Sequence, residues 1–205
     1  MDEVIMVNRM AGAILAGGES RRFGSPKAFA KQNGVYFFQR AVEALRPSVE
    51  ELYIVSHPTL LARFQQETNE KIIVDAEKYR GQGPLAGIYT VMKQTEADWV
   101  FVLPCDMPYI TERTIRQMVS YIDDSFDIVV SAHFGRVQPL VGAYHRRIID
   151  DIEQLLMAGN NRMFVLLEKR SVRYVNDTDF YEEPRVFYNM NYATEYGDIV
   201  TEKEL

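Results

Sequence analysis

Short apolar runs that alternate with helical patterns constrain the fold of this chain more than any other feature. The most apolar run, at residues 99–103, has no charged side chain on either face. Such a run is typical of a strand at the centre of a parallel sheet, with helices covering both faces. Alternation of strands and helices predicts βαβ units with right-handed crossovers, and therefore an α/β fold with a mainly parallel sheet.

The expected elements cover most of the chain. Strands are predicted at residues 11–15, 52–55, 72–74, 99–103, 126–132, 137–144, 172–175 and 186–188. Helices are predicted at residues 36–45, 60–67, 83–94, 111–122, 148–158 and 162–168, followed by a short helix that ends near residue 200. Gly83-Pro84 is typical of a helix start, and Thr111 can cap another helix.

Composition limits the class of protein. The length of 205 residues favours one domain, 1–205. A content of 47% hydrophobic and 25% charged residues excludes a disordered or fibrous chain. The net charge of −6 argues against a general nucleic-acid surface, so any anion site must be local. A single cysteine, an acidic N-terminus and the lack of an apolar stretch of about 20 residues predict a cytoplasmic protein outside the membrane.

A glycine-rich, basic loop follows the first predicted strand, in the sequence LAGGESRRFGSPK at residues 15–27. It matches neither a Walker A loop nor a GxGxxG dinucleotide fingerprint. Gly17 and Gly18 allow the backbone to approach a ligand closely and to point N–H groups at it. The basic side chains in or just after the loop are Arg21, Arg22, Lys27 and Lys31. A phosphate site is favoured over a solvated basic turn, because ligands of open α/β folds bind beyond the carboxyl ends of strands.

The apolar run at 99–103 leads directly into Pro104-Cys105-Asp106-Met107-Pro108. Asp106 is therefore expected on the same edge of the sheet as the glycine-rich loop. A carboxylate at this place can hold Mg²⁺ that bridges nucleotide phosphates, and Mg²⁺ needs few protein ligands. The alternative is an aspartate that caps a helix or turns the chain.

These two segments resemble the signature loops of nucleotidyltransferases that activate phosphorylated small molecules with a nucleoside triphosphate. The double glycine, the Arg-Arg pair and the Cys-Asp-Met-Pro run are similar to the molybdenum cofactor guanylyltransferases, as are Gly83–Gly87 and Asn189-Met-Asn191. The resemblance implies a three-layer, Rossmann-like nucleotidyltransferase fold. It also implies Mg²⁺ as cofactor, GTP and molybdenum-molybdopterin as substrates, and contacts with proteins that insert, make or accept the molybdenum cofactor.

Residue roles follow from the same resemblance. Leu15, Ala16, Gly17 and Gly18 would contact the nucleotide through the backbone, Arg22 and Lys27 would balance phosphate charge, and Asp106 would hold Mg²⁺. Asp75 would lie near the guanine or ribose. Asn189 and Asn191 would lie near the metal or the pterin substrate. Ser56 stands where the family has asparagine, and its shorter side chain weakens the expectation of a contact to the base.

Three hypotheses of function remain open at this point. The first is transfer of GMP from GTP to the terminal phosphate of molybdenum-molybdopterin. The second is a related transferase, such as a molybdopterin cytidylyltransferase or a sugar-phosphate nucleotidyltransferase. The third is a nucleotide-binding regulator without turnover, suggested by the departures at Ser56 and Tyr192. Gln138-Pro139 is compatible either with a contact to the second substrate or with a turn.

Overall fold

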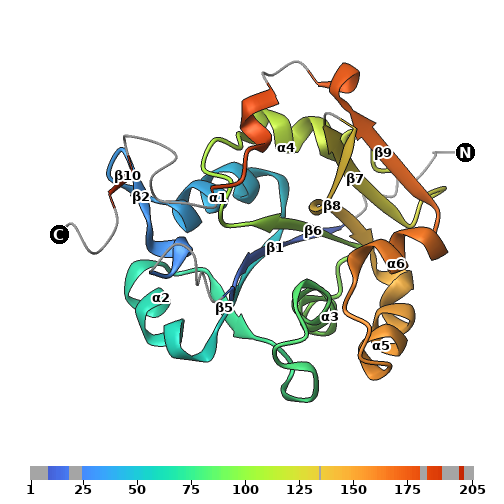
Figure 1. Ribbon diagram of the computed structural model, residues 1–205, viewed down its shortest axis with the longest axis horizontal. Helices are drawn as coiled ribbons and strands as arrows, with labels where there is room; N and C mark the ends of the chain where they lie inside the picture. The colour runs from blue at the N-terminus through green and yellow to red at the C-terminus, as the bar shows by residue number, and fades with distance from the viewer. Residues whose placement is uncertain (1–8, 19–24, 134, 181–183, 191–198, 201–205) are drawn as a thin grey trace, which may run out of the picture.

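A seven-stranded sheet forms the centre of the molecule (Figure 1). The structure is a computed structural model and describes residues 9–18, 25–133, 135–180, 184–190 and 199–200. The strands of this sheet, in spatial order, are β5 (Lys71–Val74), β4 (Glu51–Ser56), β1 (Met10–Ala16), β6 (Trp99–Pro104), β8 (Arg136–His145), β7 (Ile128–His133) and β9 (Val172–Asn176). All neighbouring pairs are parallel except those of β8, which is antiparallel to β6 and β7. The predicted, mainly parallel sheet is confirmed.

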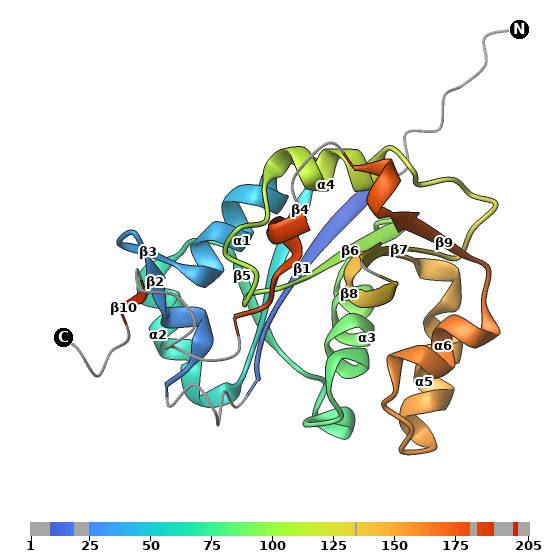
Figure 2. The same ribbon diagram turned by 45° about the horizontal axis from the view of Figure 1, so that its top comes forward.

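Helices cover both faces of the sheet, which confirms the expected three layers (Figure 2). One face is covered by α1 (Phe37–Leu45), α2 (Leu61–Glu67) and α4 (Glu112–Val119), and the other by α3 (Pro84–Gln94), α5 (Ile149–Met157) and α6 (Met163–Lys169). Residues of β6 alternate between the two cores: Phe101 packs on the α1 side and Val102 on the α3 side. The run at 99–103 is thus buried on both faces, as its composition predicts.

Local signals placed the helix starts correctly. The Thr111 side chain accepts a hydrogen bond from the backbone N–H of Thr114, and Pro84 is the first residue of α3 after Gly83. Short 3-10 helices occupy Lys27–Phe29 (η1), Arg46–Ser48 (η2), Pro58–Leu60 (η3), Glu77–Tyr79 (η4), Arg146–Ile148 (η5), Asp177–Asp179 (η6) and Pro184–Phe187 (η7). None of the helices in these described ranges is long and apolar enough to cross a bilayer.

Two expectations for the C-terminal part were wrong. The strand predicted at 186–188 falls largely in η7, because no neighbouring strand pairs with it among the described residues and Phe187 is packed into the core instead. Residues 199–200, predicted to end a helix, form the strand β10 (Ile199–Val200), which pairs with β2 (Lys31–Gln32). The remainder of that predicted helix lies outside the described residues.

A small hairpin of β2 and β3 (Val35–Tyr36) was missed from the sequence. Its turn consists of Asn33 and Gly34, whose φ angles of 52° and 79° suit a tight two-residue hairpin. Asn-Gly is the strongest local signal for such a turn, so the hairpin could have been predicted. Its strands are only two residues long, which is too short for an alternating pattern.

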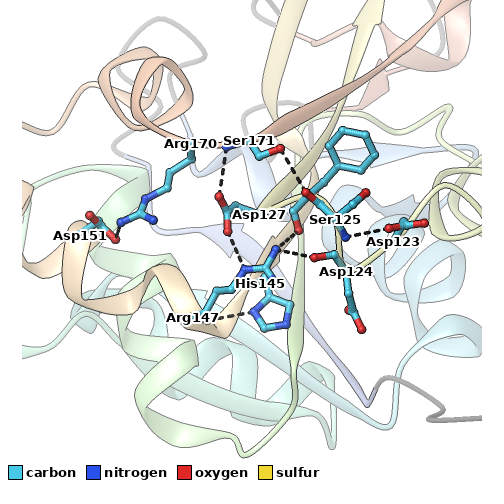
Figure 3. Close-up of polar contacts among 10 residues, drawn as sticks. Asp123, Asp124, Ser125, Asp127, His145, Arg147, Asp151, Arg170 and Ser171 are labelled. Carbon is cyan, nitrogen blue, oxygen red and sulfur yellow. Dashed lines mark hydrogen bonds and ion pairs between the residues drawn. The ribbon is translucent and has the colours of Figure 1, made fainter.

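Charged side chains form a network at the sheet edge where β7 and β9 begin and β8 ends (Figure 3). The Arg147 Nε donates to Asp127 Oδ1 at 2.6 Å, and the Ser171 N–H donates to Asp127 Oδ2 at 3.1 Å. Arg170 pairs with Asp151 on α5 in the same view. Each arginine is thus paired with an aspartate, and this edge lies opposite the carboxyl ends of β1, β4 and β6.

Gly142 in β8 is the position at which an added side chain should disturb the sheet most. A Cβ atom there would lie 2.2 Å from the Val129 carbonyl oxygen, beside the register shift between Val130 and Ser131. Gly142→Ala is therefore expected to cost about 1–3 kcal/mol or more by overpacking. At roughly 2–4 °C per kcal/mol, the thermal midpoint should fall by about 2–12 °C.

Gly18→Ala is the matched control in thermal denaturation, because no described atom lies within 4 Å of the added Cβ. An unchanged midpoint for Gly142→Ala would show that β7 and β8 can separate locally without loss of stability.

Candidate active site

A cleft of ≈ 1760 Å³ lies at the carboxyl ends of β1, β4, β5 and β6. The remaining wall comes from the first half of β8 and the C-terminal segment around residues 187–189. Of the residues predicted for the site, those that line the cleft are Leu15, Ala16, Gly17, Gly18, Lys27, Ser56, Asp75, Asp106 and Asn189. Arg22 and Asn191 lie outside the described residues. The sheet thus brings together segments that are far apart in the sequence, at the edge where α/β folds bind ligands.

The end of β1 turns into the cleft next to the end of β4. A Cβ atom on Gly17 would lie 3.4 Å from both the backbone nitrogen of His57 and the carbonyl carbon of Ser56. Glycine therefore leaves free the narrow space between the two strand ends. The Cys105 N–H donates to the Leu15 carbonyl oxygen at 3.2 Å, and this hydrogen bond joins the ends of β1 and β6.

Lys27 and Asp106 form the central charged pair of the cleft. The Lys27 Nζ lies 2.9 Å from Asp106 Oδ2, although 79 residues separate them. The two side chains are only 16% and 20% exposed. An ammonium and a carboxylate at this distance, partly screened from water, can neutralise a phosphate and hold a cation respectively.

Asp75 lies at the end of β5, on the side of the cleft away from β8. Burial raises the pKa of its carboxyl group, and a hydrogen bond from the Gly81 backbone and the charge of Arg80 oppose this rise. The carboxylate also faces α3, because a Cβ atom on Gly87 would lie 3.6 Å from Asp75 Oδ1. A side chain held in this manner can accept hydrogen bonds from a ligand.

Ser56 is buried at the end of β4, and its hydroxyl donates to the His57 carbonyl oxygen at 3.0 Å. The Ser56 hydroxyl proton is therefore already engaged in a hydrogen bond within the chain. This geometry agrees with the weaker expectation for a contact from Ser56 to a base.

The cleft also contains cations that sequence reasoning missed. Arg80 follows η4, and Arg136 is the first residue of β8; both are exposed on the cleft. Together with Lys27 they give three positive charges against the two negative charges of Asp75 and Asp106 among the described residues that line the cleft. The chain as a whole has a net charge of −6. No local pattern marks these arginines, because their place depends on how β5 and β8 are arranged in the sheet.

The described residues contain no cluster of three histidine, cysteine, aspartate or glutamate side chains that could enclose a metal ion. With Asp106 as its ligand from this described part of the chain, a metal ion would take its other ligands from a substrate or from water. That donor set suits Mg²⁺, which is commonly bound through one or two carboxylates plus substrate phosphates.

Comparison with known proteins identifies the family. The family model described as "MobA-like NTP transferase domain" matches residues 12–175. A Geobacillus protein named "Probable molybdenum cofactor guanylyltransferase" is 60% identical over 195 residues, covering 95% of this chain and 100% of its own length. The chain belongs to the molybdenum cofactor guanylyltransferase family of MobA-like NTP transferases.

Two further comparisons agree, the first in family and the second in fold. A "Probable molybdenum cofactor guanylyltransferase" of Bacillus cytotoxicus is 36% identical and covers 95% of this chain and 98% of its own. The crystal structure of "Molybdopterin-guanine dinucleotide biosynthesis protein A" from Archaeoglobus fulgidus has a TM-score of 0.74 at 22% identity, covering 89% of this chain and 93% of that one. The resemblance found in the sequence is confirmed, and this MobA-like protein is a nucleotidyltransferase of molybdenum cofactor biosynthesis.

Proposed function

We propose that this enzyme transfers GMP from GTP to the terminal phosphate of molybdenum-molybdopterin, giving molybdopterin guanine dinucleotide and pyrophosphate. The observation that carries the proposal is the pair of Lys27 and Asp106, 2.9 Å apart, in the cleft at the carboxyl ends of the strands. The names of the relatives supply the substrates, and the excess of cations in the cleft suits two phosphorylated ligands.

Each residue has a proposed role in this reaction. The backbone from Leu15 to Gly18 approaches the nucleotide, and Lys27 neutralises charge on the triphosphate. Arg22 is proposed to share the task of Lys27. Asp75 accepts hydrogen bonds from the ribose or base, and Asn189 faces the second substrate near Asp106.

Asp106 is the residue that would hold Mg²⁺. Its carboxylate is partly exposed on the cleft, and its ammonium partner can be drawn away by a phosphate, so the residues present fit this ion. When bound, Mg²⁺ supplies Lewis-acid polarisation of the phosphoryl oxygens and orients the reacting groups.

The reaction requires alignment more than proton transfer. An oxygen of the terminal pterin phosphate forms a bond to the α-phosphorus of GTP, while the bond from that phosphorus to the oxygen leading to the β-phosphate breaks. The attacking oxygen is already anionic, so no general base is needed. The chain therefore contributes by positioning both substrates and neutralising charge through groups such as Lys27.

We also infer where the reaction takes place and with which proteins. A chain with one cysteine fits a reducing compartment, and we place the enzyme in the cytoplasm. The product is a cofactor for other proteins, so we propose contacts with proteins that make, insert or accept it.

Thermal unfolding with Mg²⁺ and each of GTP, CTP, ATP and UTP tests the nucleotide. A ligand at about 100 times its dissociation constant adds about 2.7 kcal/mol of stability. At roughly 2–4 °C per kcal/mol, GTP is expected to raise the midpoint by about 5–11 °C, and the other nucleotides by less.

Release of pyrophosphate from GTP and molybdenum-molybdopterin tests the second substrate. A larger shift with CTP would support a cytidylyltransferase instead. Nucleotide binding without pyrophosphate release on addition of the pterin would support a regulator without turnover.

A further inference from the structure

The segment Val186–Met190 is buried at both ends and displays two side chains between them. Phe187 and Met190 are 3% and 0% exposed, whereas Tyr188 is 46% exposed and Asn189 is also exposed. Tyr188 and Asn189 both line the cleft. The segment is therefore held at both ends by buried side chains, and Tyr188 and Asn189 lie between these ends.

Phe187 fixes the first end. Its ring stacks on that of His133, with centroids 3.4 Å apart and planes inclined by 23°, and it meets the Phe180 ring edge-on at 4.9 Å. The Gln138 Nε2 donates to the Phe187 carbonyl oxygen at 3.4 Å. His133 is itself buried and fixed, because its Nδ1 lies 2.5 Å from Asp177 Oδ1.

Met190 fixes the second end beside the charged pair. Its side chain packs in a small core with Ala30 and Phe37. Ala30 directly follows the 3-10 helix that contains Lys27. Its backbone N–H donates to the Asp106 carbonyl oxygen at 2.8 Å. The displayed side chains therefore have a defined position relative to Asp106.

The exposed ring of Tyr188 indicates a functional role for this residue. Among the described residues, the exposed large hydrophobic side chains are Met157, Phe164, Tyr174 and Tyr188, and of these only Tyr188 lines the cleft. An aromatic ring that is held open in a cleft suits contact with a flat ring of a ligand.

The sheet order indicates which ligand this is. The proposed nucleotide residues Gly17, Ser56 and Asp75 lie at the carboxyl ends of β1, β4 and β5, which are on one side of β6. Tyr188 belongs to the segment anchored by His133 and Gln138, from β7 and β8, on the other side of β6. Asp106, which follows β6, lies between the two halves.

We infer that Tyr188 is a binding residue for the second substrate, and that its ring stacks on the flat pyrimidine part of the pterin. This inference rests on the proposed function for the identity of that substrate. The Phe187 and Met190 anchors keep the tyrosine ring in place before the ligand arrives, which reduces the entropy lost on binding.

Tyr188→Ala tests the inference with two probes. Fluorescence quenching of 6-hydroxymethylpterin measures the affinity for the ring alone, and steady-state kinetics at saturating GTP measures the KM for molybdenum-molybdopterin. Loss of one aromatic stacking partner is expected to weaken the affinity for 6-hydroxymethylpterin and to raise the KM for molybdenum-molybdopterin, each by about 5- to 100-fold. Tyr188→Phe keeps a ring and is expected to bind the pterin more tightly than Tyr188→Ala.

Tyr174→Ala is the matched control, because Tyr174 is an exposed tyrosine of β9 outside the cleft lining. The thermal shift caused by GTP should be the same in all variants. Unchanged pterin affinity in Tyr188→Ala, equal weakening of GTP binding, or no pterin binding by the wild type would each overturn the inference. Quenching that depends on Tyr188 without any product from molybdenum-molybdopterin would support the stacking role and reject the proposed function.

Discussion

Replacing Asp106 by alanine is expected to lower turnover by about 1,000-fold, at the upper end of the effect of removing one group that stabilises transition-state charge. The variant loses the carboxylate proposed to hold Mg²⁺, and Lys27 loses its ion-pair partner. The fold should survive, because both side chains retain contact with water and Lys27 can turn toward solvent. Pyrophosphate release under saturating GTP and molybdenum-molybdopterin, together with circular dichroism, checks both statements.

Asp98→Asn provides a control at the opposite end of β6. Asp98 directly precedes β6, whereas Asp106 follows it, and Asp98 accepts a hydrogen bond from the Arg9 backbone that asparagine can also accept. Its turnover should equal that of the wild type. Near-normal turnover in Asp106→Ala would reject the metal role of this residue.

Lys27→Ala is expected to lower kcat by about 100-fold and to weaken GTP binding, because the triphosphate loses a cation in a partly buried site. The Lys27 side chain is only 16% exposed, so water replaces its charge less effectively than at a surface position. Stopped-flow pyrophosphate release and calorimetric titration with GTP separate the effect on turnover from the effect on affinity.

Lys31→Ala is the corresponding control, because Lys31 lies in β2, only four residues further along, and is not among the residues that line the cleft. A loss in Lys31→Ala as large as that in Lys27→Ala would indicate a diffuse effect of positive charge rather than a contact made by Lys27.

The core of the fold could be predicted because its signals are local. The run at 99–103 is apolar on both faces, and the structure buries it on both faces. Thr111 and Gly83-Pro84 mark helix starts through hydrogen bonding and backbone geometry that involve neighbouring residues only. The antiparallel direction of β8 and the pairing of β10 with β2 depend on contacts between distant segments, and the sequence pattern does not specify these contacts.

The candidate site was predictable to a similar degree. Gly17 and Asp106 each follow a strong strand, so their place at one edge follows from the fold class. The direct pairing of Lys27 with Asp106 required the three-dimensional arrangement, as did the hydrogen bond from Ser56 to its own chain. The aromatic pattern at 186–188 predicted a strand, but its true role is to bury Phe187 against His133 and to expose Tyr188.

The ion pair between Lys27 and Asp106 has a thermodynamic consequence for the proposed roles. A divalent cation that arrives alone must displace the ammonium, and a nucleotide that arrives alone draws Lys27 away and leaves a carboxylate facing its phosphates. When both arrive, each removes the obstacle to the other. Their affinities are therefore linked, and the factor by which the cation strengthens nucleotide binding equals the factor by which the nucleotide strengthens cation binding.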